Sequence, residues 1–295
     1  MTLKKLLFMF LITILIAIGI IYYIDNQKAV LKQPLIPQED EEQVMEEIQP
    51  EEEETEEDVQ QENSLTERVS TVFQETLDRI FQREVKIVAI GDSLTRGVGD
   101  ATEGGGYVGI LERTLNQNRH VATFENLGLP GNRSDQLLRR LDQPEIMEEL
   151  EDADLVLITI GANDILKVTR EHFTNLEIDV FIDEQARYEE RLKQILEKIQ
   201  SINENAEIYL LGIYNPFEKY FQDIEELNQI VNAWNTTGSD LTMEMENVTF
   251  IPIDDLFADN ENPIFADDNF HPNYAGYYLM AERVLEYISK EEEEG

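Results

Sequence analysis

The chain has 295 residues, enough for one large domain or two small ones with a sizeable core. Its formal net charge of −39 at pH 7 argues against a nucleic-acid partner, because no cluster of basic residues is available to neutralise phosphates. The absence of cysteine excludes disulfides, thiolate catalysis, cysteine-bound zinc and lipid attachment to cysteine.

The chain begins with an uncharged apolar run, residues 6–24, directly after Lys4 and Lys5. Its length is close to the ~20 residues that a membrane-spanning helix needs. A cleaved signal peptide is the alternative, but its apolar region would be shorter and a small-residue cleavage site would follow, where this chain has the sequence YYID. We therefore expect residues 1–27 to be an uncleaved single-pass anchor in the cell membrane. The two lysines predict a cytoplasmic N-terminus and place the rest of the chain outside the cell.

Residues 28–63 follow as an acidic segment, with 14 acidic and no basic residues between positions 39 and 62. Dense like charge, several prolines and few aromatic residues predict a disordered, extended linker. A cation-binding acidic tail is the alternative, which the lack of spaced ligands disfavours. The third segment, residues 64–295, is predicted to be the folded domain. It opens with helical spacing of apolar residues over 69–81, which predicts a helix packed on that domain.

Five apolar runs rich in β-forming residues then recur through the domain, at 85–90, 122–127, 155–160, 208–213 and 248–253. Amphipathic helical stretches separate them, among them 109–115, 188–202 and 224–236. Strands that alternate with helices and are apolar on both faces predict an α/β fold, with a parallel sheet covered on both sides. We find no internal repeat and no second domain after residue 64. Ligands of such sheets bind at the carboxyl ends of the strands.

A serine stands at the first of these strand ends, Ser93 in the sequence GDSLTRG. It could cap the following helix, help to hold a phosphate, or act as a nucleophile, and the last role needs a general base. His120 is expected on a surface connection and His172 on a solvated, charged stretch. His271 precedes a proline and follows Asp268 by three residues, a spacing that can bring the carboxylate to the imidazole Nδ1.

Acyl transfer also needs donors where negative charge develops on the carbonyl oxygen. Ser93 and Gly131 can offer backbone N–H groups in tight loops, and Asn163 can offer a side-chain amide directly after the third strand. No phosphate-binding loop or helix cap would require all of these residues together. The combination favours the nucleophile.

The sequences GDSL, NLGLPGN, GAND and DNFHP, in this order, resemble the GDSL family of serine ester hydrolases, also called SGNH hydrolases. The resemblance extends over about residues 85–288. It implies a flavodoxin-like three-layer α/β/α sandwich with a five-stranded parallel sheet, and a mechanism without metal or organic cofactor. It also implies that Ser93 is the nucleophile and that Asp268 and His271 complete the catalytic triad. Gly131 and Asn163 are the implied oxyanion donors.

Several neighbouring residues have competing interpretations. Gly128 is the alternative oxyanion glycine, but Gly131 stands five residues after Asn126, as the family pattern has it. Asp164 is expected to cap a helix that starts at Ile165 or to fix a neighbouring loop. Trp234 is expected to pack in the core. Residues 103–109 are predicted to form a flexible loop beside the nucleophile.

These features together predict a membrane-anchored extracytoplasmic ester hydrolase, with a lysophospholipid or a short-chain acyl ester as the leading substrate. Deacetylation of a cell-wall or capsular sugar is the alternative within the same class. A non-catalytic lipid- or glycan-binding module that keeps the fold is the alternative from another class. The expected partners are a small ester or lipid substrate and the membrane. The sequence leaves the oligomeric state open.

Overall fold

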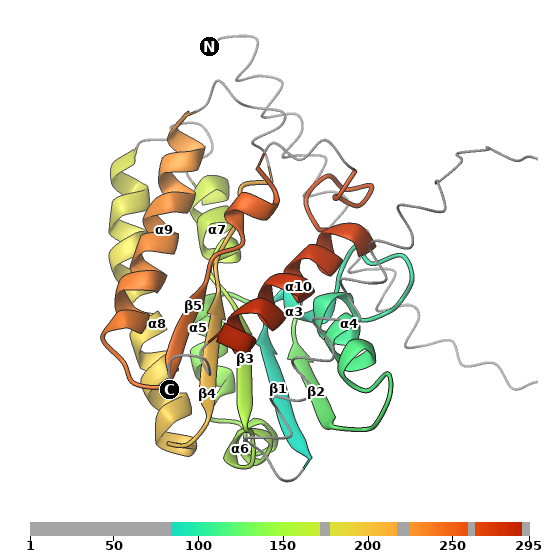
Figure 1. Ribbon diagram of the computed structural model, residues 1–295. Helices are drawn as coiled ribbons and strands as arrows, with labels where there is room; N and C mark the ends of the chain where they lie inside the picture. Colours follow the sequence, from blue (N-terminus) through green and yellow to red (C-terminus); the bar gives the residue numbers. More distant parts are fainter. Residues whose placement is uncertain (1–83, 172–177, 217–224, 259–262, 291–295) are drawn as a thin grey trace, which may run out of the picture. The chain divides into compact units, whose positions relative to one another are not determined.

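The computed structural model describes residues 84–171, 178–216, 225–258 and 263–290. They form a five-stranded parallel sheet in the order β2-β1-β3-β4-β5, with helices on both faces (Figure 1). This is the predicted three-layer α/β/α arrangement. The predicted anchor, acidic linker and helix over 69–81 lie outside the described residues. None of the helices in the described ranges has the length and apolar character needed to cross a bilayer.

All five predicted strands are present, with ends that differ from the prediction by one or two residues: β1 Val85–Gly91, β2 Ala122–Gly128, β3 Leu155–Thr159, β4 Glu207–Leu211 and β5 Val248–Ile251. The expectation that every strand is apolar on both faces is wrong for β2. That strand lies at the edge of the sheet, where Thr123 and Glu125 are exposed. An edge strand needs apolar residues only where a neighbouring element covers it.

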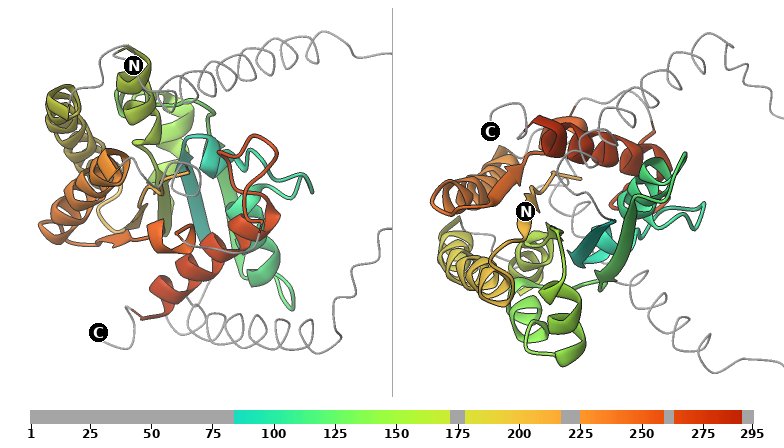
Figure 2. Two further views of the ribbon diagram at one scale, coloured as in Figure 1. Left: turned by 90° about the horizontal axis from the view of Figure 1, so that it is seen from above. Right: turned by 60° about the horizontal axis from the view of Figure 1, so that its bottom comes forward.

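The side chains of β1 alternate between two separate apolar cores. Ile87 and Ala89 face the core shared with α4 (Gly106–Leu115) and α10 (Tyr274–Lys290). Val88 and Ile90 face the opposite core. Figure 2 shows the sheet between α10, in red, and the green helices of this second face. The helices of the second face are α5 (Ser134–Arg140), α6 (Pro144–Glu151), α7 (Ala162–Glu171), α8 (Ile178–Ile202) and α9 (Glu225–Met243).

The helices are longer than the apolar spacing predicted. α8 begins ten residues before the predicted start at residue 188, and α9 continues seven residues beyond the predicted end at residue 236. A buried acid, Glu184, interrupts the apolar face of the stretch added to α8, and the stretch added to α9 is mostly polar, with the sequence TGSDLTM. The predicted loop over 103–109 is wrong in its second half. There α4 already begins at Gly106, whose N–H donates to Asp100 Oδ2 (3.1 Å).

Candidate active site

The turn after β1 carries Ser93 as the first residue of the short helix α3 (Ser93–Arg96). Asp92 caps this helix, because its Oδ1 accepts the N–H of Leu94 (3.0 Å). Thr159, at the end of β3, donates its hydroxyl to the same oxygen (2.8 Å). Gly91 is required just before the turn, since a Cβ there would lie 2.2 Å from the carbonyl oxygen of Thr159. The turn is thus fixed by its own cap and by the neighbouring strand.

The structure brings together the three residues predicted to form a triad. Ser93 Oγ lies 3.0 Å from His271 Nε2, and His271 Nδ1 lies 2.6 Å from Asp268 Oδ2. Asp268 Oδ1 accepts the backbone N–H groups of Phe270 and His271, both at 2.9 Å. One carboxylate therefore fixes both the loop and the ring carried by that loop. These distances are those of a nucleophile, its general base and the group that orients the base.

The Asp268 carboxylate is adapted to remain ionised. Burial raises its pKa, but the hydrogen bonds from His271 and Phe270 and the positive charge that His271 can carry outweigh burial, so the pKa of Asp268 lies below its ordinary value. Tyr214 supports the same loop from the sheet side by donating its hydroxyl to the Phe270 carbonyl (2.8 Å). An ionised Asp268 keeps the proton on His271 Nδ1 and leaves Nε2 free to accept from Ser93.

The second loop presents Gly131 in an exposed, left-handed conformation with φ of 76°. Among the described residues, the N–H groups of Ser93 and Gly131 have no hydrogen-bond partner. Gly128 differs, because its N–H donates to Asn126 Oδ1 (3.0 Å). An unoccupied N–H can serve an incoming ligand without first breaking a bond in the protein. The geometry thus favours Gly131 over Gly128 as a donor.

The loops after the first three strands are joined to one another. The Leu129 N–H donates to the Gly91 carbonyl (3.0 Å), which connects the second loop to the residue just before the nucleophile turn. Asn163 Nδ2 donates to the carbonyl of Asn132 (3.1 Å), which connects the third loop to the residue after Gly131. The segments that carry Ser93, Gly131 and Asn163 are therefore connected to one another.

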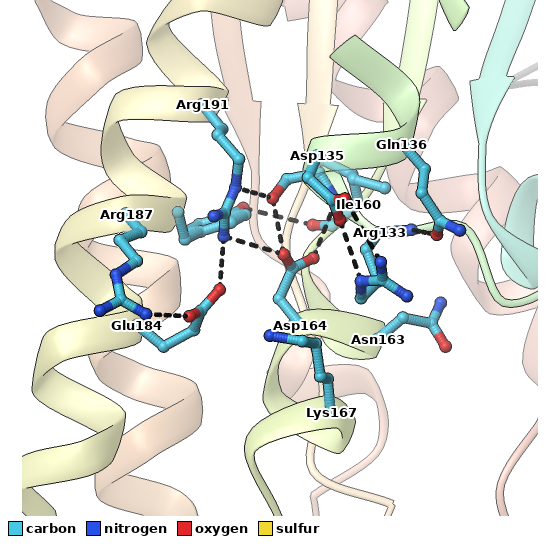
Figure 3. A network of polar contacts seen from close by, with 12 residues as sticks. Arg133, Asp135, Gln136, Ile160, Asn163, Asp164, Lys167, Glu184, Arg187 and Arg191 are labelled. Atoms are coloured by element: carbon cyan, nitrogen blue, oxygen red, sulfur yellow. Dashed lines mark hydrogen bonds and ion pairs between the residues drawn. The ribbon is translucent and has the colours of Figure 1, made fainter. Parts of the chain in front are cut away.

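Asp164 has a larger role than a helix cap. α7 begins at Ala162, not at Ile165, so Asp164 lies in the first turn of the helix. Its two oxygens accept the N–H and the hydroxyl of Ser134, at 3.0 and 2.6 Å (Figure 3). Fixing a neighbouring loop, the second of the two expectations for Asp164, is confirmed. Sequence reasoning missed Ser134, its further partner Arg191, and Glu184, which pairs with Arg191.

Asp92 and Asp164 are both almost fully buried, with exposed fractions of 2% and 1%. Burial is the main cause that raises the pKa of both carboxyl groups, to about 6 for Asp92. The charge of Asp164 also raises the pKa of Asp92, and the charge of Glu184 raises the pKa of Asp164. The carboxyl ends of β1 and β3 thus hold two buried acids that are distinct from Asp268.

Predictions were also made for the two other histidines and for Trp234. His120 is exposed and pairs with Glu84 (2.9 Å), as expected for a surface connection, and His172 lies outside the described residues. Trp234 is 1% exposed and stacks on Tyr188 with ring centroids 5.8 Å apart, so its predicted packing role is confirmed.

Comparison with known proteins agrees with this geometry. The model of the GDSL-like Lipase/Acylhydrolase family matches residues 89–279. The protein YpmR of Bacillus subtilis is 36% identical over 214 residues, which cover 71% of this chain and 84% of YpmR. The spore germination lipase LipC of Bacillus licheniformis is 26% identical over 211 residues, which cover 68% of this chain and 94% of LipC.

Solved structures show the same fold. The lipase Lip_vut3 from a goat rumen metagenome has a TM-score of 0.60 and 26% identity, over 68% of this chain and 95% of that one. A catalytic variant of Axe2, an acetylxylan esterase from Geobacillus stearothermophilus, has a TM-score of 0.54 and 22% identity, over 70% and 94% of the two chains. The second likeness concerns the fold alone.

Proposed function

Because the chain belongs to the GDSL-like lipase/acylhydrolase family of ester hydrolases, we propose that it cleaves carboxylic esters with Ser93 as the nucleophile. The observation that carries this proposal is the hydrogen-bonded series from Asp268 through His271 to Ser93 Oγ, with distances of 2.6 and 3.0 Å. A serine used only as a helix cap would need neither the histidine nor its carboxylate.

In the first half of the reaction, His271 Nε2 accepts the proton of Ser93 as Oγ attacks the acyl carbon. The resulting imidazolium is stabilised by Asp268, which accepts from Nδ1. Negative charge develops on the carbonyl oxygen, where the N–H groups of Ser93 and Gly131 and the Asn163 amide can donate. His271 then protonates the leaving alcohol, and the acyl group remains on Ser93.

In the second half, water replaces the alcohol. His271 takes a proton from the water, the hydroxide attacks the acyl-serine, and the same donors bind the second oxyanion. Collapse of this intermediate releases the carboxylic acid and returns the proton to Ser93. The cycle needs no group beyond the residues named and water.

The proposed substrate is a lysophospholipid or a short-chain acyl ester at the outer face of the cell membrane. Two observations support it: the apolar run at 6–24 after Lys4 and Lys5, and the similarity to LipC, a relative named as a lipase. Acetylated cell-wall or capsular sugars are the competing substrates. Initial rates on lysophospholipids, short-chain esters and acetylated sugars, measured with one enzyme preparation, separate these possibilities.

Labelling with a fluorophosphonate tests the nucleophile, since only an activated serine reacts. We expect the wild-type chain to be labelled, and Ser93→Ala to lose both labelling and ester hydrolysis while keeping the wild-type circular dichroism spectrum. Near-wild-type turnover by Ser93→Ala would end the mechanism. An unlabelled, inactive wild-type chain would instead indicate a lipid- or glycan-binding module.

The anchor is tested separately by cell fractionation of the full-length chain. We expect it in the membrane fraction, and we expect protease added to wall-stripped cells to release the domain. A chain recovered from the medium and shortened by about 25 residues, the length of a signal peptide, would establish cleavage and contradict the anchor.

A further inference from the structure

A buried group of charged residues lies next to Asn163, on the second face of the sheet, and consists of Asp164, Glu184 and Arg191 (Figure 3). Arg191 of α8 reaches Asp164 Oδ1 with Nη2 (3.1 Å), and the same nitrogen lies 2.6 Å from Glu184 Oε1. Its Nε donates to Ser134 Oγ (2.7 Å). The side chains of Arg191, Asp164 and Glu184 are 20%, 1% and 6% exposed. The guanidinium thus has three partners, each in a fixed direction.

These partners belong to the two loops that carry the proposed donors. Ser134 is the first residue of α5 and follows Gly131 by three positions. Asp164 is the direct neighbour of Asn163 in the first turn of α7. Ser134 donates to both oxygens of Asp164, so the start of α5 is held against the start of α7. A shift of either helix would change the distance between Gly131 and Asn163.

We propose that Asp164, Ser134 and Arg191 are positioning residues, which hold the Gly131 N–H and the Asn163 amide in the relative geometry that binds the oxyanion. This inference rests on the proposed function. Among the described residues, the three side chains make no hydrogen bond or ion pair with Ser93, Asp268 or His271. They therefore act on the donors and not on the nucleophile.

The chemistry of the group fits positioning better than general stabilisation. Burying charges costs desolvation, and buried ion pairs can often be replaced by apolar residues without loss of stability. What apolar contacts do not provide is direction. Arg191 uses Nε and Nη2 on different partners, a planar two-armed arrangement that lysine cannot reproduce. Oxyanion stabilisation depends on such direction, because misplacement by about 1 Å can cost ~10²-fold in rate.

Two conservative variants test the proposal in the full-length chain: Ser134→Ala, which removes one hydroxyl, and Arg191→Lys, which keeps the charge but not the two-armed geometry. We expect kcat on a water-soluble ester to fall about 10- to 100-fold, with KM changed less than about threefold, because charge on the oxygen appears only in the transition state. Unchanged kcat in both variants would overturn the proposal.

Arg187→Ala is the matched control on the same helix. Among the described residues Arg187 pairs only with Glu184 Oε2 (3.3 Å), and its side chain is 65% exposed. Its kcat should equal that of the wild type. An equal loss of kcat in Arg187→Ala would show that any disturbance of α8 lowers activity, and would overturn a specific role for Ser134 and Arg191.

A double-variant cycle separates positioning from loosening of the whole domain. If Ser134 acts through the Asn163 amide, Ser134→Ala should lower kcat less than about threefold in the Asn163→Ala background, because the group it positions is already gone. The same fold-loss in both backgrounds would contradict the proposal. Should Arg191→Lys fail to fold by circular dichroism, Ser134→Ala decides alone.

Failure of this inference and failure of the proposed function give different results. If Ser93→Ala keeps its turnover, the hydrolase mechanism fails, and the positioning role that rests on it fails as well. If Ser93→Ala is inactive while Ser134→Ala and Arg191→Lys keep the wild-type kcat, the mechanism stands and only the positioning role is lost.

Discussion

The turn that carries Ser93 and the segments that carry the proposed donors Gly131 and Asn163 hold their buried carboxylates in different ways. Asp92, in the nucleophile turn, accepts from Leu94 N–H and the Thr159 hydroxyl, and both bonds end on one oxygen, Oδ1. No cation among the described residues forms an ion pair with it. Asp164, between the oxyanion loops, accepts at both oxygens and pairs with Arg191 (3.1 Å). Asp92 joins its own turn to the end of β3, whereas Asp164 joins α7 to α5 and α8.

This difference shows how the two halves of the site depend on the rest of the fold. The cap of Asp92 on Leu94 spans two residues, so it forms with the turn itself. The contacts of Ser134 with Asp164 and with Arg191 span 30 and 57 residues, so they exist only once α5, α7 and α8 have packed. The turn that carries Ser93 therefore has one local contact in addition to its long-range bond from Thr159, whereas the contacts between Ser134, Asp164 and Arg191 are all long-range.

The largest expected effect comes from removing a donor on the oxyanion side. Asn163→Ala should lower kcat about 10²–10³-fold, which corresponds to about 3–4 kcal/mol, with little change in KM. Steady-state kinetics on a soluble ester measure both constants. A raised KM with unchanged kcat would mean that Asn163 binds the substrate in its ground state. The segment that carries Asn163 would then not supply an oxyanion donor.

Exchanging carboxylate for amide at Asp164 tests the need for two accepting oxygens. Asn offers one acceptor, so in Asp164→Asn its NH2 group must face either the Ser134 N–H or the donors at the other oxygen. One buried donor is left unpaired, and we expect a loss of about 2–3 kcal/mol in the free energy of unfolding. Urea denaturation at pH 8 measures it. A variant as stable as the wild type would show that the second oxygen is dispensable.

The same exchange at Asp92 should have the opposite sign and a smaller size. The amide oxygen can take the place of Oδ1, and among the described residues no donor faces Oδ2. Asp92→Asn also removes a charge that burial disfavours, since burial raises the pKa of this carboxyl from 3.8 to about 6. We expect a gain of roughly 1–2 kcal/mol at pH 8.

The pH dependence of this gain follows from the raised pKa. Between pH 3.8 and about 6 the folded state holds the Asp92 proton more tightly than the unfolded state, so this group lowers wild-type stability as pH rises through that window. Asp92→Asn lacks this fall. The difference between the two proteins should therefore be full above about pH 6 and vanish near pH 3.8. A pH-independent difference would assign the gain to packing.

The smallest effect is expected on the outer side of α5, where charge is exposed. Arg139 pairs with Asp135 (3.0 Å) and its side chain is 67% exposed. Arg139→Ala should change the unfolding free energy by less than about 0.5 kcal/mol, because solvent screens such pairs and Asp135 keeps Arg133 as a partner. A loss comparable with that of Asp164→Asn would mean that burial does not determine how much an ion pair contributes to the free energy of unfolding.

The sequence predicted the parts of the site that depend on short motifs. Asp268 and His271 are three residues apart, and Ser93 and Asn163 directly follow apolar strands, so their chemistry could be recognised without the fold. The five strands were also found, whereas the exposed face of β2 was not, although the polar residues Thr123 and Glu125 at alternate positions are the signal of a solvated strand face.

The charged group behind the donors was missed because it depends on which face of α8 is buried. In the helix, Glu184 and Arg191 stand seven residues apart, in line with Phe181, Tyr188 and Ile195, which are all buried. An acid and a base on the apolar stripe of a helix are the signal that could have revealed the pair. The apolar spacing was recognised only from residue 188 onward, so Glu184 was never set against Arg191.

The hydrogen bond between Ser93 and His271 joins residues 178 positions apart, and the Tyr277 hydroxyl, on α10, reaches back to the Val98 carbonyl across 179 positions (2.7 Å). Ribosomes make the chain from its N-terminal end, so the serine is synthesised long before the base that activates it. Until then the serine lacks the histidine contact on which its proposed role as nucleophile depends. If Asp268 and His271 act as proposed, activity requires synthesis beyond residue 271: a chain that stops before residue 268 contains all five strands of the sheet but lacks both of these residues.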